Sequence, residues 1–167
     1  EEAVDALEQV LGAAVARQSV ADVPLGTFLS GGVDSSAVTA LLQARASQPV
    51  RSFSIGFDDP AYDESIHAQA VARHLGTDHH ELIVSPQDAM AVIPQLPSIY
   101  SEPFADSSQI PTFLVARMAR AHVTVSLSGD AGDELFAGYN RHVHGHSSWP
   151  RLARIPAIFR QALGKAI

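Results

Sequence analysis

The feature that most constrains the fold is an alternation of strand-like and helix-like segments along most of the chain. Apolar residues that recur every three or four positions indicate amphipathic helices, and short runs of β-branched and aromatic residues indicate strands. The predicted strands are 23–29, 50–57, 80–84 and 122–127, and the predicted helices are about 2–18, a segment that ends before Pro49, 62–75, 86–94 and 111–121, with a loop at 97–108.

This alternation favours an α/β fold in which right-handed crossovers join parallel strands. We expect a mostly parallel sheet of four to five strands flanked by helices. In such sheets ligands bind beyond the carboxyl ends of the strands. The loops that follow the predicted strands are therefore the first places to look for a site.

Composition excludes several classes of protein. The 167 residues are 46% hydrophobic, enough for the core of one domain, and the chain has no cysteine for disulfides or thiolate metal sites. No apolar run approaches the ~18 residues of a membrane span, and a net charge of −7 argues against a broad polyanion-binding face. We expect a cytoplasmic protein with no membrane or nucleic-acid partner. Apolar faces at 2–18 and 149–163 predict a homo-oligomer.

The first chemical motif follows strand 23–29 and reads Ser30-Gly31-Gly32-Val33-Asp34-Ser35-Ser36. Adjacent glycines let backbone N–H groups approach a ligand, and a helix start adds unpaired N–H groups, so the motif predicts phosphate binding. The alternative is a tight turn in which Asp34 or Ser35 caps the helix. The motif lacks the Gly-Lys-Ser/Thr of a Walker loop and the glycine spacing of a dinucleotide fingerprint. An aspartate inside an anion site requires a cation beside it, so Asp34 predicts Mg²⁺.

The second motif follows strand 122–127 and places Asp130, Asp133 and Glu134 within five residues. One interpretation is helix capping, with Asp130 as the N-cap and Asp133 three residues later. Like charges this close resist joint ionisation unless a metal or a cationic substrate lies between them. Both motifs therefore indicate a cation at the carboxyl edge of the sheet.

Five segments of the chain, taken in order, form a specific pattern. They are SGGVDSS (30–36), FSIGFDDPAYDE (53–64), LGTDHHE (75–81), EPFADSSQIPT (102–112) and SLSGDAGDELFAGY (126–139). Together they resemble the synthetase domain of glutamine-dependent asparagine synthetases, whereas SGGxDS alone is typical of all ATP pyrophosphatases. The resemblance covers about 23–141 and implies the three-layer fold of the adenine-nucleotide α-hydrolases.

The resemblance also implies a reaction. An aspartate side-chain carboxylate attacks the α-phosphate of ATP, pyrophosphate leaves, and ammonia from a glutaminase domain outside this chain displaces AMP to give asparagine. By position, ATP contacts are implied for Leu29, Ser30, Gly31, Gly32, Asp34, Ser35, Ser36, Ile55 and Gly129, with Leu29 and Ile55 along the adenosine. The resemblance assigns Mg²⁺ to Asp34 and Asp133, and a catalytic role near the attacking carboxylate or ammonia to Asp130. Open alternatives are another carboxylate acceptor, β-lactam closure, or nucleotide binding without catalysis.

The chain also departs from the family pattern. Asp130 stands where many relatives carry Glu, and Ala131 and Ala137 stand where glycines are frequent, which disfavours alanine if φ is positive there. Lys165 is the only lysine, and its surroundings do not match the family's pyrophosphate-binding lysine. We therefore expect 1–167 to be one partial synthetase domain that binds Mg-ATP weakly and does not complete synthesis alone. Its expected parts are a helix at 1–20, a nucleotide-binding core at 21–141, and a connector with a truncated helical tail at 142–167.

Several polar groups have open roles. Asp58, Asp59, Asp63 and Glu64 follow the second predicted strand and either contact the nucleotide or Mg²⁺-bound water or form a solvated turn with a helix cap. The loop 102–108 either holds the acceptor substrate or is structural. His79 and His80 should face opposite sides of a strand, and His142, His144 and His146 would share a face only if that segment were a strand.

Overall fold

The structure is a computed structural model that describes residues 2–58, 63–103, 105–157 and 159–160. The chain divides into two compact units, 1–129 and 130–167, and each is described by itself. None of the helices in the described ranges combines the length and apolar character needed to cross a membrane.

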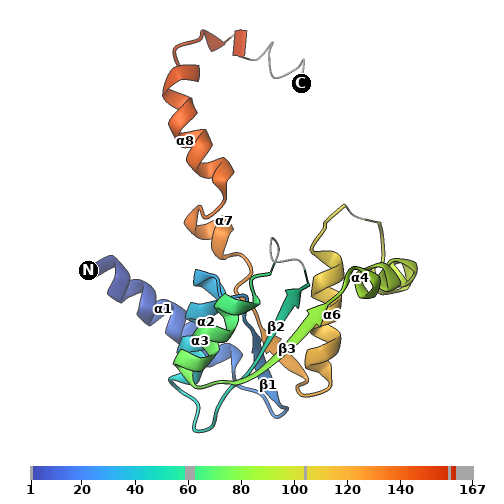
Figure 1. The fold of residues 1–167 in the computed structure, drawn as a ribbon. Helices are drawn as coiled ribbons and strands as arrows, with labels where there is room; N and C mark the ends of the chain where they lie inside the picture. Colours follow the sequence, from blue (N-terminus) through green and yellow to red (C-terminus); the bar gives the residue numbers. More distant parts are fainter. Residues whose placement is uncertain (1, 59–62, 104, 158, 161–167) are drawn as a thin grey trace. The chain divides into compact units, whose positions relative to one another are not determined.

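The first unit contains a four-stranded parallel sheet with the order β3-β2-β1-β4 (Figure 1). Its strands are β1 (Leu25–Phe28), β2 (Arg51–Phe57), β3 (Asp78–Val84) and β4 (Val125–Leu127). The predicted parallel α/β sheet is confirmed.

The strand limits differ from the prediction. β1 begins two residues later and ends one residue earlier than the predicted 23–29, and β2 begins one residue later than the predicted 50–57. β3 begins at Asp78, two residues earlier than predicted, because Asp78 pairs with Arg51 and His79 with Ser52. β4 begins only at Val125, because the N–H groups of His122 and Val123 still donate to the carbonyl of Ala119 in the preceding helical turn. The starts of β3 and β4 are set by pairing that the local sequence does not reveal.

Helices cover both faces of the sheet, which gives three layers (Figure 1). The helices of the first unit are α1 (Glu2–Gln18), α2 (Val33–Gln43), α3 (Ser65–Leu75), α4 (Pro86–Val92), α5 (Leu96–Ile99) and α6 (Gln109–Arg120), with a 3₁₀ turn at Ile93–Gln95. α5 lies partly inside the segment predicted as loop 97–108. Residue 62, where the third predicted helix was expected to begin, lies outside the described ranges, as do residues 59–61.

Two buried clusters show how the layers pack. On one face, Leu29 packs with Ala68 and Ala72 of α3, and on the other, Phe53 packs with Ala119 and Val123 at the end of α6. Phe53 is fully buried, and burying a side chain of this size stabilises the fold by about 1.5–3 kcal/mol. The core therefore holds the end of β1, where the glycine motif begins, and the neighbouring part of β2 in a fixed position.

His79 and His80 face opposite sides of β3, as predicted. His79 lies with Nδ1 2.8 Å from Oγ of Ser52 and Nε2 3.1 Å from Oγ of Ser54. His80 instead stacks on the Phe53 ring, with centroids 5.4 Å apart, and lies 4.1 Å from the His122 ring. Both imidazoles are therefore held in packing contacts within the first unit.

Burial, the largest cause, lowers the pKa of His79 below its ordinary value of about 6.5. The unfolded chain therefore binds more protons than the folded chain as the pH falls through about 6.5, so the stabilisation is present above that pH and is lost toward the folded-state pKa. For His79→Gln we expect the free energy of unfolding to depend less steeply on pH between about 7 and 5. Urea denaturation at several pH values measures this slope. The variant His74→Gln, at an exposed position of α3, should keep the wild-type slope, and an unchanged slope in His79→Gln would contradict the prediction.

The second unit contains α7 (Gly132–Phe136) and α8 (Asn140–Leu152). His142, His144 and His146 lie in α8, where residues two apart do not share a face. The strand-like arrangement considered for them is therefore wrong. No group of three or more His, Asp or Glu side chains in the described ranges is arranged to hold a metal ion.

Candidate nucleotide-binding site

The glycine motif forms a tight loop around the hydroxyl of Ser35. This oxygen accepts from the N–H of Ser30 at 3.2 Å, lies 2.9 Å from Oγ of Ser30, and donates to the carbonyl of Gly32 at 3.3 Å. The N–H of Gly32 in turn donates to Oγ of Ser30 at 3.3 Å. The loop is therefore shaped by its own serines before α2 begins.

α2 starts without a side-chain cap. Gly32 is its N-cap residue, and no side chain accepts a hydrogen bond from the first turn. The alternative in which Asp34 or Ser35 caps the helix is therefore wrong, and the unpaired N–H groups of the first turn stay available to an anion. Oγ of Ser36 is buried and has no hydrogen-bond partner within the described part of the chain. A buried hydroxyl of this kind calls for a partner that the protein itself does not supply.

Two close approaches fix the loop against its neighbours. Gly31 has φ = 82°, and a Cβ atom there would lie 2.6 Å from the backbone N of Ala68 in α3. A Cβ atom on Gly129, just after β4, would lie 2.6 Å from the backbone N of Ser35. Only glycine fits at either point, so the ends of β1 and β4 meet at the start of α2.

A cavity of about 170 Å³ adjoins this loop at the carboxyl ends of β1 and β2. Three of the residues assigned to ATP contribute to it, namely Leu29, Ser30 and Ile55. The rest of its lining is Phe28, Phe53, Ser54, Phe57, Glu64 and Val115. The cavity is mostly apolar with a few polar groups, a composition typical of small-molecule sites, and it lies next to the loop that is predicted to bind phosphate.

The sequence did not point to several lining residues. Phe57 lies two residues after Ile55 on β2, so alternation along the strand was the available signal for it, whereas Phe28 directly precedes Leu29 and alternation does not indicate it. Val115 comes from α6, far along the chain, and no local pattern indicates it. A larger cavity of about 490 Å³ lies at the amino ends of β1 and β2, lined by residues such as Pro24 and Arg51. It is at the edge of the sheet opposite to the one where parallel sheets bind ligands.

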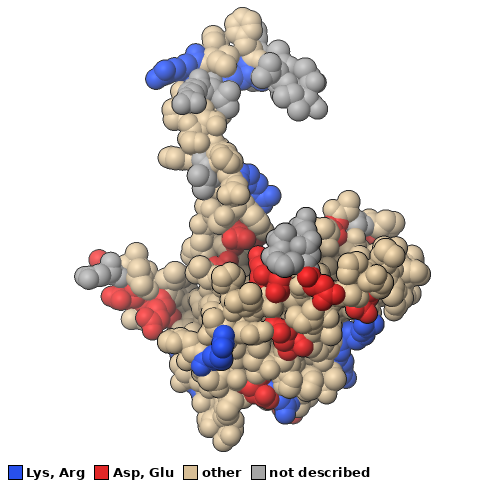
Figure 2. Space-filling view, in the orientation of Figure 1, with Lys and Arg blue, Asp and Glu red and all other residues tan. Residues whose placement is uncertain are grey.

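The acidic residues after β2 have separate roles. Oδ1 of Asp63 accepts from the N–H of Ser65 at 3.0 Å, and hydrogen bonds from Ser65, first that of its side chain, lower the pKa of Asp63. Asp63 thus terminates the turn before α3, Asp58 is exposed, and Glu64 lines the cavity. Asp59 lies outside the described residues. Figure 2 shows Asp and Glu side chains at several places on one face of the protein.

Two residues of the loop 102–108, Asp106 and Ser108, form a hydrogen-bonded turn. Oδ1 of Asp106 accepts from the N–H of Ser108 at 2.8 Å and from its hydroxyl at 2.7 Å. This turn leads directly into α6. A substrate-holding role for the rest of the loop stays a prediction.

The second acidic motif belongs to the second unit. α7 begins at Gly132 with Ala131 as its N-cap residue, so the interpretation that Asp130 caps this helix is wrong. The Asp133 carboxylate occupies the place where a side chain on Gly138 would lie. Glu134 accepts a hydrogen bond of 2.7 Å from the Tyr139 hydroxyl, which lowers the pKa of Glu134. The motif therefore holds the carboxylates of Asp133 and Glu134 in defined surroundings, and the joint Mg²⁺ role of Asp34 and Asp133 stays a prediction.

Ala131 and Ala137 both have positive φ, 74° and 60°, on either side of α7. A left-handed backbone costs a residue with a Cβ atom roughly 1–2 kcal/mol. We expect Ala131→Gly and Ala137→Gly each to raise the free energy of unfolding of the second unit by about 1 kcal/mol, partly offset by the greater freedom of glycine in the unfolded chain. Urea denaturation followed by Tyr and Trp fluorescence measures the change. Gly145→Ala, in α8, is the comparison in which alanine should be the more stable residue, and a loss of stability in both glycine variants would contradict the expectation.

The fold defines a class of proteins. An ammonia-dependent NAD synthetase from Campylobacter jejuni has a similar structure, with a TM-score of 0.55 and 15% identity over 81% of this chain and 60% of that chain. An NMN synthetase from Francisella tularensis matches to the same TM-score at 16% identity. The chain therefore has the adenine-nucleotide α-hydrolase fold, as predicted.

Sequence comparison defines the family. The asparagine synthase family model matches residues 6–166. Asparagine synthetase [glutamine-hydrolyzing] 1 of Bacillus subtilis is 38% identical over 85% of this chain and 22% of its own length. Asparagine synthetase B [glutamine-hydrolyzing] of Escherichia coli is 34% identical over 80% of this chain and 26% of its own length. The chain belongs to the asparagine synthase family, and it spans about a quarter of the length of these relatives.

Proposed function

We propose that this chain is the ATP-binding part of an amide-forming ligase that activates the side-chain carboxylate of aspartate. The observation that carries the proposal is the apolar cavity that opens beside the glycine loop at the carboxyl edge of the sheet. The family relatives are named for glutamine-dependent asparagine synthesis, which supports aspartate as the acceptor and ammonia as the nitrogen donor.

The proposed reaction has two steps. A carboxylate oxygen of aspartate attacks the α-phosphorus of ATP while the bond to the bridging oxygen of pyrophosphate breaks. Ammonia then attacks the activated carbonyl carbon, AMP leaves, and the nitrogen loses a proton. Because negative charge grows on the pyrophosphate oxygens in the first step, the N–H groups of residues 33–35 in the first turn of α2 would stabilise the transition state without rearrangement.

Individual residues receive roles in this proposal. Leu29 and Ile55 pack against the adenosine, and Ser30, Ser35 and Ser36 belong to the loop that holds the phosphates, while Asp130 accepts the proton that ammonia loses. Mg²⁺, when bound by the carboxylates of Asp34 and Asp133, neutralises phosphate charge. The acidic oxygens of the two motifs suit this hard cation, which prefers carboxylates and phosphate oxygens.

Calorimetry with ATP, adenosine and pyrophosphate, each with and without Mg²⁺, tests the binding step. We expect ATP to bind more tightly than either of its parts, because the cavity and the loop act on one molecule. Exchange of labelled pyrophosphate into ATP in the presence of different carboxylates tests the acceptor, and exchange with aspartate alone supports the proposal. Failure of the chain to bind ATP would refute the proposal, and formation of asparagine from ammonia by this chain alone would refute the expectation that it does not complete synthesis.

A further inference from the structure

Among the described residues, Glu64 is the one charged residue that lines the cavity beside the glycine loop. The remaining lining is apolar apart from two serines. Of these, Ser54 already has its hydroxyl 3.1 Å from Nε2 of His79, and Ser30 belongs to the glycine loop. The carboxylate of Glu64 is therefore the main polar group that this cavity offers to a nucleoside.

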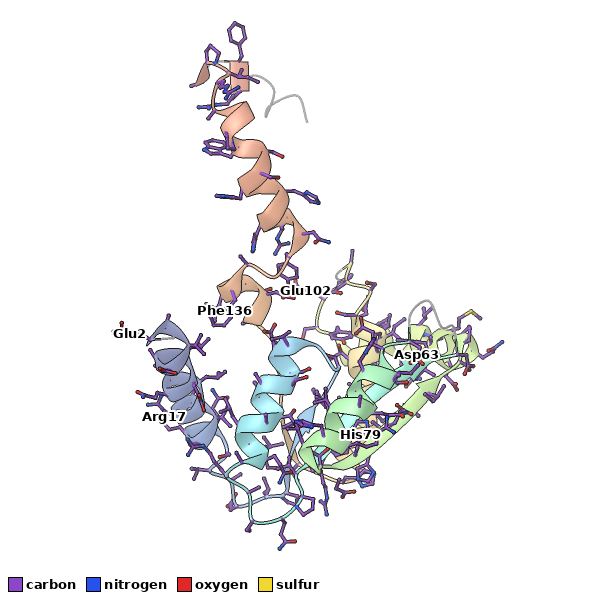
Figure 3. The ribbon with its side chains drawn as sticks, turned by 60° about the vertical axis from the view of Figure 1, so that its left-hand side comes forward. Glu2, Arg17, Asp63, His79, Glu102 and Phe136 are labelled. Atoms are coloured by element: carbon purple, nitrogen blue, oxygen red, sulfur yellow. The ribbon has the colours of Figure 1, made fainter. Side chains whose placement is uncertain are left out.

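The carboxylate of Glu64 is not used by the fold. Among the described residues it has no hydrogen-bond or ion-pair partner, whereas the neighbouring Asp63 is engaged with Ser65 at 3.0 Å. The backbone beside it is nevertheless held firmly. A Cβ atom on Gly56 of β2 would lie 2.8 Å from Oδ1 of Asp63 and 2.9 Å from Cβ of Ser65, so the start of α3 sits directly on the strand (Figure 3).

The position of Glu64 along the nucleotide follows from its neighbours. Its carbonyl accepts from the N–H groups of His67 and Ala68, at 3.0 and 3.3 Å, and these two residues pack against Gly31 of the phosphate loop. Glu64 is thus one helical turn from that loop, and this exposed residue lines the cavity together with Ser30. In a nucleotide whose phosphates lie at the loop and whose base lies among the aromatic rings, the part between them is the ribose.

We infer that Glu64 is a specificity residue that accepts hydrogen bonds from the 2′- and 3′-hydroxyls of the ribose of ATP. An ionised carboxylate only accepts hydrogen bonds, so it pairs with the vicinal diol and repels phosphate. It therefore favours a ribonucleotide in one direction, with the sugar at Glu64 and the phosphates at the glycine loop. This inference rests on the proposed ATP binding and adds a sugar-recognition role to it.

Calorimetric titration of wild type, Glu64→Gln and Asp58→Asn with Mg-ATP and with the Mg²⁺ complex of 2′,3′-dideoxy-ATP tests the inference. A hydrogen bond to a charged group contributes about 1.5–3 kcal/mol, so the wild type should bind ATP on the order of tenfold or more tightly than the dideoxy analogue. Glu64→Gln should lose most of this difference by weakening ATP binding, with little change for the analogue. Asp58→Asn removes an exposed carboxylate that follows the same strand but does not line the cavity, and it should keep the wild-type ratio.

Three results would overturn the inference while leaving ATP binding intact. Glu64→Gln could weaken ATP and the analogue equally, could leave both unchanged, or could alter the ratio of ATP to GTP affinity without altering the dideoxy ratio, which would assign the carboxylate to the base. If the folded wild-type chain binds neither nucleotide, the proposed function itself fails. Because Glu64 is exposed, urea denaturation should show equal stability for wild type and variant.

Discussion

Replacing Gly31 by alanine is expected to weaken ATP binding on the order of 100-fold and to lower the free energy of unfolding by about 3 kcal/mol. The first cost is conformational, since φ is 82° and a left-handed backbone costs a Cβ-bearing residue roughly 1–2 kcal/mol. The second is steric, since the new atom would lie 2.6 Å from the backbone N of Ala68, and overpacking costs typically about 1–3 kcal/mol. Relief of the clash would move the loop, and its N–H groups would no longer point at the phosphates together. Calorimetry with Mg-ATP and urea denaturation measure the two effects.

Gly76→Ala separates the two causes. Gly76 also has a positive φ, 71°, but nothing lies within 4 Å of a Cβ atom there. Alanine at this position should cost only the conformational part, roughly 1–2 kcal/mol, and should leave ATP binding unchanged. If Gly31→Ala and Gly76→Ala had the same stability and the same affinity for ATP, the close packing of the loop against α3 would have no functional consequence.

The parallel sheet could be predicted because its determinants are local. Phe53 and Ile55 alternate with serines on β2, and the helical periodicity between the strands requires crossover connections. The ends of β3 and β4 could not be predicted, because they depend on pairing with Arg51 and on hydrogen bonds back to Ala119. Helix α5 interrupts the predicted loop since Leu96 and Ile99 pack on the buried residues Val84, Val92 and Leu114, a contact that local composition does not indicate.

The residues of the candidate site likewise fall into those that the local sequence indicates and those that only the packing of the fold reveals. The glycine motif could be recognised from the sequence, because two adjacent glycines, Gly31 and Gly32, are typical of a backbone that approaches a ligand closely. Glu64 was one of four acidic residues with the same apparent chance of contacting the nucleotide, and only the turn at Asp63 and the cavity distinguish it. Val115 reaches the cavity through the packing of α6 on β2, so no sequence pattern marks it. The family pattern, with frequent glycines at the positions of Ala131 and Ala137, indicated only that a positive φ there would disfavour alanine, and the structure shows that φ is positive at both.

Asp34→Asn is expected to change ATP binding in opposite directions with and without Mg²⁺. Asp34 lies in the first turn of α2, beside the glycine loop that we propose holds the phosphates. Without a metal its negative charge repels the phosphates, so removing the charge should strengthen the binding of metal-free ATP several-fold. With Mg²⁺ the carboxylate is expected to act as a ligand of the ion. Its loss should weaken Mg-ATP binding on the order of tenfold to 100-fold, a loss similar to that of a hydrogen bond to a charged group.

Titration with ATP in EDTA and in excess Mg²⁺ measures both directions for the wild type, Asp34→Asn and the exposed α1 variant Asp5→Asn. Asp5→Asn should leave both affinities unchanged, which controls for the loss of one negative charge from the whole chain. The same titration of Asp133→Asn tests its predicted share in the metal site. If Asp34 had only a structural role, Asp34→Asn would weaken the binding of both metal-free ATP and Mg-ATP. If Asp34 only repelled phosphate, the variant would bind both more tightly. Stronger binding of metal-free ATP together with weaker binding of Mg-ATP is therefore the result that assigns the carboxylate to Mg²⁺. A change of the same sign in EDTA and in Mg²⁺ would remove that assignment.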